Sequence, residues 1–135
     1  MMFERYSDKA RRVIFFARYE ASEFGSPIID TEHLLLGILR ESQDLLLSVA
    51  SSTAVSTIRD RIRQQVPIRD KIPTSVDLPF SESAKNSLNW ATEEADQLGN
   101  RTITPLHILL GFAAGAELPG TEDPGRTGSN VGNRF

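Results

Sequence analysis

Cysteine is absent from this 135-residue chain, so neither a disulfide framework nor a thiolate metal site is available to it. The formal net charge is only -3, and no basic patch interleaved with aromatic residues occurs, which argues against a nucleic-acid-binding protein. No apolar run approaches the ~20 residues of a membrane-spanning helix, and the N-terminus has no signal-peptide pattern. We therefore expect a cytoplasmic protein that uses no cofactor and no metal.

Sequence patterns of catalysis are missing as well. The chain contains no Gly-x-x-x-x-Gly-Lys-[Ser/Thr] motif, so no nucleotide chemistry can be assigned to it. No Ser/His/Asp arrangement and no pair of carboxylates has a spacing that suggests an active site. With 39% hydrophobic and 24% charged residues, the composition is that of one globular domain, or of one domain and a tail. The sequence thus favours a binding protein over an enzyme.

What the sequence does contain is an internal repeat. The block Ile29–Ile38 recurs seventy-four residues later as Ile103–Phe112, without a gap. Over the longer segments 6–38 and 80–112, 11 of 33 positions are identical. Matches of this density at one fixed offset indicate two copies of one structural unit. We assign repeat one to residues 3–66, a proline-containing connector to 67–80, and a partial repeat two to 81–113.

Apolar residues recur at every third or fourth position in both repeats, which predicts an all-α fold. Ser7 and Ser81 are expected to cap the first helix of each repeat, and Gly25 and Gly99 to follow its end. In repeat one we expect a second helix capped by Asp30 or Thr31, a third over 44–50, and a fourth that is capped by Ser52 or Thr53 and ends at 66. Three arginines of this fourth helix are interpreted as a solvated face, namely Arg59, Arg61 and Arg63.

Two residue pairs of the repeated block are interpreted as structural. Gly37 and Gly111 lie inside predicted helices, where glycine costs about 1 kcal/mol relative to alanine, so we expect a neighbouring helix to approach closely there. His33 and His107 stand at the start of these helices. No second His or Cys lies at ligand spacing in either copy, so we interpret both as histidines bonded to the backbone, not as metal ligands or acid–base groups.

The repeat pattern stops near residue 113. Residues 115–135 contain five glycines and two prolines with few apolar residues, so we expect 114–135 to be a disordered tail. Repeat two is then incomplete, and Leu109, Leu110 and Phe112 lose part of their cover. Self-association through this apolar patch is expected.

The blocks Tyr6–Ala10 and Thr31–Glu41 resemble the amino-terminal repeat domain of the Clp protease unfoldases, whose signature is a doubled Thr-Glu-His-Leu-Leu-Leu-Gly block. The resemblance covers residues 2–112. It implies an all-α, pseudo-twofold domain of two four-helix repeats, which in full-length relatives precedes two ATPase modules and recruits substrates or adaptor proteins. This chain would then be a stand-alone interaction domain with unfolded or arginine-phosphorylated proteins, adaptors or a Clp ATPase as partners.

The resemblance also implies a ligand pocket, because one branch of the family recognises phosphorylated arginine with a glutamate and a hydroxyl residue in each repeat. Glu32 and Ser7 match these positions in repeat one. A carboxylate can accept from guanidinium N–H groups, and a helix N-terminus suits a phosphoryl group. In repeat two Ser81 is kept, but Leu106 replaces the glutamate, so we expect that pocket to be lost. Without a ligand, Glu32 is a first-turn acid and Ser7 an N-cap.

A second interpretation is that the chain is an amino-terminal fragment of a full Clp ATPase subunit. Residues 112–117 admit a codon choice in which deletion of one base yields Leu-Leu-Arg-Glu-Gln, close to the continuation of repeat one at 38–42. The tail would then come from a frameshift. The gene sequence tests this hypothesis, which fails if no single-base change restores a helical reading.

Overall fold

The computed structural model describes residues 3–121, and for residues 116–121 it describes the backbone alone. Within this range every regular element is an α-helix, and two isolated residue pairs form the only bridges. The predicted all-α class is therefore confirmed. The helices are α1 (Asp8–Phe24), α2 (Thr31–Glu41), α3 (Gln43–Leu47), α4 (Ser52–Ser56), α5 (Ile58–Gln65), α6 (Glu82–Gln97) and α7 (Pro105–Thr121).

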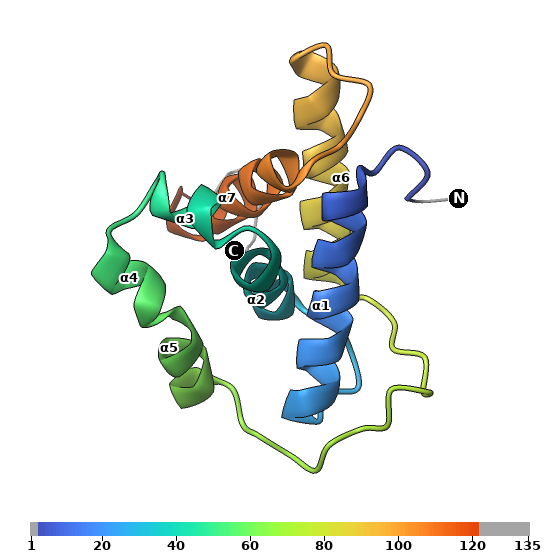
Figure 1. Ribbon diagram of the computed structural model, residues 1–135, viewed down its shortest axis with the longest axis vertical. Coiled ribbons are helices and arrows are strands. Elements are labelled where there is room, and N and C mark those ends of the chain that lie inside the picture. Colours follow the sequence, from blue (N-terminus) through green and yellow to red (C-terminus); the bar gives the residue numbers. More distant parts are fainter. Residues whose placement is uncertain (1–2, 122–135) are drawn as a thin grey trace.

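The long helices form two pairs, one from each repeat (Figure 1). α1 packs mainly against α2, and α6 packs mainly against α7, while the contacts between the pairs are fewer. The connector at 67–80 runs along the end of α1, where the N–H groups of Arg69 and Ile72 donate to the carbonyls of Phe24 and Ser22 (2.9 and 3.0 Å). This is the pseudo-twofold arrangement that the repeat predicts.

Each helix pair crosses where a glycine faces the partner helix. A Cβ atom on Gly37 would lie 2.3 Å from the carbonyl oxygen of Val13 in α1, and one on Gly111 would lie 2.4 Å from that of Ser87 in α6. Small side chains on both sides let the two backbones touch, which is the close approach that the repeated glycine indicates. Both first helices carry fully buried alanines, of which Ala17 and Ala91 adjoin the two glycines; the full set is Ala10, Ala17 and Ala21 in α1 and Ala84, Ala91 and Ala95 in α6.

Both repeats start and stop their first helix in the same way. Ser7 Oγ and Ser81 Oγ each accept a hydrogen bond, at 3.0 Å, from a backbone N–H in the first turn of α1 and α6. Gly25 and Gly99 adopt left-handed conformations after the helices, with φ angles of 71° and 74°. These caps explain why the two copies have nearly the same helix length.

The second half of repeat one differs from its prediction. The third helix covers Gln43–Leu47 instead of 44–50, and the predicted fourth helix is divided at Thr57 into α4 and α5. Thr57 Oγ1 donates to the carbonyl of Ala54 (3.0 Å), and Ser56 Oγ donates to that of Thr53 (2.9 Å). These side-chain bonds compete with the helical backbone ladder and account for the break.

Helix α7 extends past the boundary that composition predicts. Its backbone is helical as far as Thr121, whereas the glycine and proline content predicts a tail from 114. At Gly115 a Cβ atom would lie 2.7 Å from the ring of Trp90 in α6, so the helix continues because it packs against an aromatic side chain. The rest of the predicted tail, 122–135, lies outside the described residues.

One apolar face of α7 has less cover than its counterpart on α2. Leu109, Leu110 and Phe112 are partly exposed, whereas Leu36 and Ile38, which correspond to the last two, are fully buried. α3 and α5 pack against α2 and help to cover it. Self-association through the face of α7 remains a prediction.

Both repeat histidines accept a backbone hydrogen bond at the start of their helices. The N–H of Asp30 donates to His33 Nδ1, and that of Thr104 donates to His107 Nδ1, each at 2.9 Å. His107 Nε2 then donates to Asn100 Oδ1 (2.8 Å), but His33 Nε2 is buried with no hydrogen-bond partner among the described residues. Burial lowers the pKa of both imidazoles, which keeps them neutral at pH 7.

The unpartnered nitrogen leads to a stability prediction. Ser26 occupies the repeat position of Asn100, so Ser26→Asn is expected to give His33 Nε2 an acceptor and to raise the free energy of unfolding by about 1 kcal/mol. The reverse change, Asn100→Ser, should lower it by a similar amount. Urea unfolding followed by circular dichroism measures both variants. A Ser26→Asn protein no more stable than the parent would contradict this account.

Candidate functional site

Two helix starts from different repeats meet at what we name the α2–α6 junction, formed by Asp30, Glu32 and Ser81. Ile29 and Phe80 form a parallel bridge there, and the N–H of Ser81 donates to the carbonyl of Ile29 (3.0 Å). The N-terminal ends of α2 and α6 therefore lie side by side. Helix N-termini carry partial positive charge and free N–H groups, so their meeting favours an anion.

The equivalent α1–α7 junction is formed by Ser7, Thr104 and Leu106. Tyr6 and Ile103 form its bridge, and the N–H of Ser7 donates to the carbonyl of Ile103 (2.9 Å). Leu106 occupies the position of Glu32 and is 43% exposed. This junction has the same backbone frame as the first but no glutamate in the first turn of its second helix.

Glu32 lies in the first turn of α2. Its side chain is half-buried, and this burial raises the pKa of its carboxyl. No lysine, arginine or histidine of residues 3–121 forms an ion pair with it. The carboxylate is therefore available to a cation from outside the domain.

Asp30 occupies the space between the two helix starts. Its Oδ1 accepts a hydrogen bond from the Ser81 hydroxyl (2.7 Å) and another from the N–H of Thr31 (2.8 Å). The chain's own carboxylate thus takes up donors that an external anion would use. An anionic ligand at this junction has to displace Asp30 or share Ser81 with it.

The structure does not bring Ser7 and Glu32 together. Ser7 lies at the start of α1, and Phe24 lies at its end, about 25 Å away for 17 residues at 1.5 Å each. The ring of Phe24 contacts that of His33, the neighbour of Glu32, at 5.8 Å between centroids. The hydroxyl that reaches the start of α2 is that of Ser81, from the other repeat.

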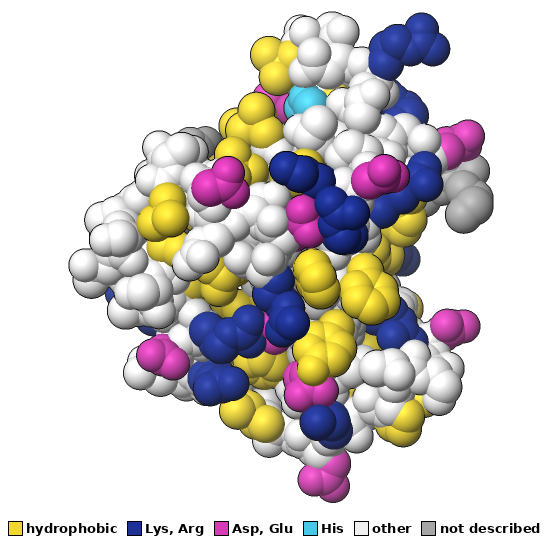
Figure 2. All heavy atoms as spheres, in the orientation of Figure 1, with side chains coloured by type: hydrophobic (Ala, Val, Ile, Leu, Met, Phe, Trp, Pro, Cys, Tyr) yellow, Lys and Arg dark blue, Asp and Glu magenta, His cyan; other side chains and the backbone are white. Residues whose placement is uncertain are grey.

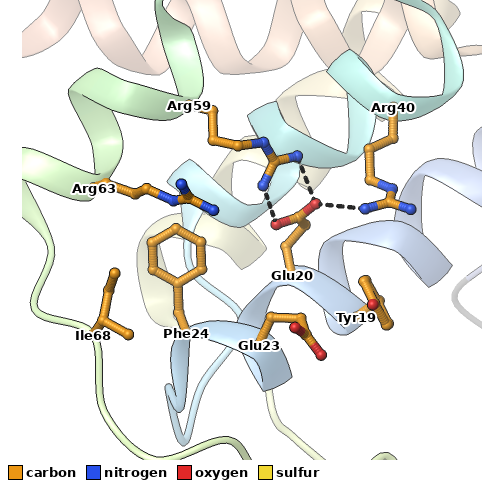
Figure 3. A pocket seen from close by; sticks show the side chains of 8 residues that line it. All are labelled: Tyr19, Glu20, Glu23, Phe24, Arg40, Arg59, Arg63 and Ile68. Carbon is orange, nitrogen blue, oxygen red and sulfur yellow. Dashed lines mark hydrogen bonds and ion pairs between the residues drawn. The ribbon is translucent and has the colours of Figure 1, made fainter.

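A buried ion-pair network joins α1, α2 and α5 (Figure 3). Glu20 is only 1% exposed, and its carboxylate accepts hydrogen bonds from Arg59 (2.7 and 2.8 Å) and Arg40 (3.1 Å). Burial alone would raise the pKa of Glu20, but the hydrogen bonds from the two arginines outweigh it and hold the pKa below its usual range. Through the pair of Arg59 with Glu20, the network holds α5 against the C-terminal part of α1.

The interpretation of the three arginines as a solvated face is wrong for Arg59, whereas Arg61 and Arg63 are exposed. A signal in the sequence could have found the network. Glu20 falls within the apolar stripe of α1, next to Ala21, and a carboxylate at such a position requires a cationic partner.

A cavity of about 390 Å³ opens beside this network. Besides Glu20 and its two arginines, it is lined by Phe24 of α1, Arg63 of α5 and Ile68 of the connector. Figure 3 shows Arg63 extending toward the ring of Phe24. The cavity is polar on the side of the arginines and apolar on the side of Phe24 and Ile68.

Two kinds of feature are absent from the described part of the chain. Among the side chains of residues 3–115, no group of three or more histidines, aspartates or glutamates could hold a metal ion. None of the described helices is both long enough and apolar enough to cross a membrane.

The family model of the Clp repeat (R) N-terminal domain matches residues 5–121. The chain belongs to this family. The match includes both junctions and continues to the end of α7, and it confirms the resemblance inferred from the doubled block.

Curated relatives of this Clp N-terminal domain are subunits of much greater length. The chain is 37% identical over 112 residues to the ATP-dependent Clp protease ATP-binding subunit ClpA homolog of Guillardia theta, and 36% identical to the chloroplastic chaperone protein ClpC1 of Oryza sativa subsp. japonica. Each match covers 82% of this chain, but only 14% and 12% of those proteins.

Solved structures show the same fold. The N-terminal domain of the chaperone ClpD from Arabidopsis thaliana has a TM-score of 0.66 and 29% identity, over 87% of this chain and 85% of that one. A chain from a malarial protein secretion system has a TM-score of 0.72 at 15% identity, over 82% of this chain and 77% of its own length, which shows the fold alone.

Proposed function

We propose that this Clp N-terminal domain is a protein-interaction domain that recruits substrates, degrons or adaptor proteins to a Clp-type ATP-dependent unfoldase or protease. Its sequence contains no Walker A motif, so the proposal assigns ATP hydrolysis and peptide-bond cleavage to other polypeptides or modules. The observation that carries the proposal is the half-buried carboxylate of Glu32, which has no cation of the described chain beside it and stands where two helix starts meet.

The α2–α6 junction suits both halves of a phosphorylated arginine. The Glu32 carboxylate would accept hydrogen bonds from the guanidinium group, and this pairing would offset the burial that raises its pKa. The phosphoryl group would lie against the N-termini of α2 and α6, near the Ser81 hydroxyl. The proposed site therefore combines Glu32 with Ser81, and it leaves Ser7 to the α1–α7 junction.

Asp30 is the internal competitor of the phosphoryl group in this proposal. Asp30→Ser keeps a side chain that can cap α2 but removes the carboxylate that lies 2.7 Å from Ser81 Oγ, so we expect about a tenfold gain in affinity for phosphoarginine. Isothermal titration of the folded domain measures the change. Binding of unmodified arginine should not improve.

The matched control is Thr104→Ser at the α1–α7 junction, because Thr104 occupies the repeat position of Asp30. It should leave the affinity for phosphoarginine within about twofold, while Glu32→Gln should reduce it about tenfold or more. An Asp30→Ser variant that binds phosphoarginine less tightly than the parent would contradict this assignment.

A second candidate function is that of the amino-terminal part of a full Clp ATPase subunit. It is favoured by the small share of the relatives' length that this chain spans, 14% and 12%. A longer reading frame that encodes ATPase modules would support it. The cytoplasmic location expected from the sequence is retained as a proposal, which fractionation of the source cells tests.

A further inference from the structure

The arginine-lined cavity between α1 and α5 is not used by the site at the α2–α6 junction, and its charges do not balance. Arg40 and Arg59 share the single carboxylate of Glu20. The other carboxylate of the cavity, that of Glu23, is paired with Lys71 of the connector (3.3 Å). The cavity therefore has an excess of guanidinium groups over free carboxylates.

Arg63 lines the cavity, and no carboxylate among the described side chains, those of residues 3–115, forms an ion pair with it. It is exposed, and it stands one helical turn after Arg59 on the same face of α5, so both guanidinium groups face the cavity. Guanidinium groups bind carboxylates with paired N–H donors, which makes an unpaired arginine beside a cavity a suitable partner for an acidic side chain.

An exposed aromatic surface on α1 adjoins the cavity. Phe15 is 64% exposed, and its ring lies 5.6 Å from that of Phe16. Arg40 stacks over the rings of Phe16 and Tyr19, at 5.1 and 5.0 Å from the centroids, and so connects this surface to the cavity. Figure 2 shows hydrophobic side chains over α1 beside a group of Lys and Arg side chains over α5. Large exposed aromatic groups next to arginine are typical of protein-binding surfaces.

We infer that this combined surface, the cavity at Arg63 with the aromatic face of Phe15, docks an acidic segment of a partner polypeptide. One carboxylate of that segment enters the cavity and pairs with Arg63, and an apolar side chain nearby in the segment lies on Phe15 and Phe16. The net charge of -3 disfavours nucleic acid as the occupant. The volume of about 390 Å³ accommodates one or two side chains and not a folded element.

This surface shares with the proposed function only the premise that the domain binds polypeptides. The α2–α6 junction attracts a guanidinium group through Glu32, whereas the surface at Arg63 attracts a carboxylate. A partner that engages both would present opposite charges to the two places. The two assignments can therefore succeed or fail separately.

The test uses fluorescein-labelled peptides of equal length that differ at one position, Asp, Asn or phosphoserine, next to a phenylalanine, and follows their anisotropy with the full chain. The Asp peptide is expected to bind, and the affinity for the Asn peptide should be lower by about fivefold or more. Arg63→Ala should lower the affinity for the Asp peptide by a similar factor, and Phe15→Ser should lower the affinity for both the Asp and the Asn peptide. Arg59 is left unchanged, because its loss would unpair the buried Glu20.

Arg61→Ala is the matched control, since Arg61 is exposed on the opposite face of α5 and does not line the cavity. Arg61→Ala should change the affinity for the Asp peptide by no more than about twofold relative to the parent. Equal effects of Arg61→Ala and Arg63→Ala would overturn the inference, as would equal binding of the Asp and Asn peptides. More than about tenfold tighter binding of the phosphoserine peptide would also overturn it, because the occupant would then be a phosphate. Glu32→Gln separates the two proposals, because it should leave the affinity for the Asp peptide unchanged and lower only the affinity for phosphoarginine.

Discussion

Gly37→Ala is expected to destabilise the domain by about 3 kcal/mol or more, because the added methyl group has no space at the crossing of α1 and α2. Its Cβ atom would lie 2.3 Å from the carbonyl oxygen of Val13 and 3.1 Å from the backbone nitrogen of Ala17. Both neighbours are backbone atoms of a helix, so relief requires α2 to move as a body. The intrinsic preference of helices for alanine over glycine, about 1 kcal/mol, acts in the opposite direction and is outweighed.

Gly99→Ala is the control for this prediction. Gly99 has a φ angle of +74° and no heavy atom within 4 Å of its would-be Cβ, so alanine there costs only the strain of the left-handed conformation, about 1 to 2 kcal/mol. Urea unfolding of both variants compares the two effects. The account of the helix crossing fails if Gly37→Ala costs no more than Gly99→Ala.

Arg59→Ala is expected to lower the free energy of unfolding by about 3 kcal/mol at pH 7. Its guanidinium group is the bidentate partner of Glu20, which is 1% exposed and would be left with Arg40 alone. Breaking a buried pair by removal of one partner is costly because the other charge stays buried. Arg61→Ala, two residues away and exposed, should change stability by less than about 0.5 kcal/mol. The double variant Glu20→Ala/Arg59→Ala should be more stable than Arg59→Ala alone, and a less stable double variant would contradict the network.

The effect of Arg59→Ala should also depend on pH. The pKa of Glu20 is lower in the folded state than its ordinary value of about 4.3, so the folded state favours the ionised carboxylate. The stability that this group contributes is present above that value and is lost as the pH falls through the lower folded pKa. The difference in free energy of unfolding between the parent and Arg59→Ala should therefore be constant from about pH 8 to 5.5 and should shrink below about pH 4. A difference that grows toward acid pH would be incompatible with an ionised Glu20.

The all-α fold with two repeats could be predicted because the two copies repeat the residues that decide local structure. The serine caps, the glycines after the first helices and the glycines at the crossings recur at one offset, and each acts within its own helix pair. The observed helix boundaries differ from the predicted ones at two contacts, the side-chain hydrogen bond of Thr57 and the packing of Gly115 against Trp90. Neither contact follows from apolar periodicity or composition.

The candidate site could be predicted only in part. The repeated block indicates Glu32, and the family resemblance pairs it with Ser7 of the same repeat, whereas the fold places Ser81 of the other repeat at the start of α2. Ser81 and Asp30 are 51 residues apart, and Arg59 and Glu20 are 39 residues apart. Contacts of this range depend on how the two repeats dock and on how α5 folds back onto α1. No local spacing encodes them, although a glutamate within an apolar stripe indicates that a cationic partner must exist.

An NMR titration of the ¹⁵N-labelled domain with phosphoarginine distinguishes the α2–α6 junction from the α1–α7 junction as the place where the ligand binds. We expect amide shifts confined to residues 29–34 and 79–84, on both sides of the α2–α6 junction, and we expect Glu32→Gln to remove them. Shifts centred on Ser7 and Leu106, or no shifts at millimolar ligand, would contradict the assignment of ligand recognition to Glu32 and Ser81.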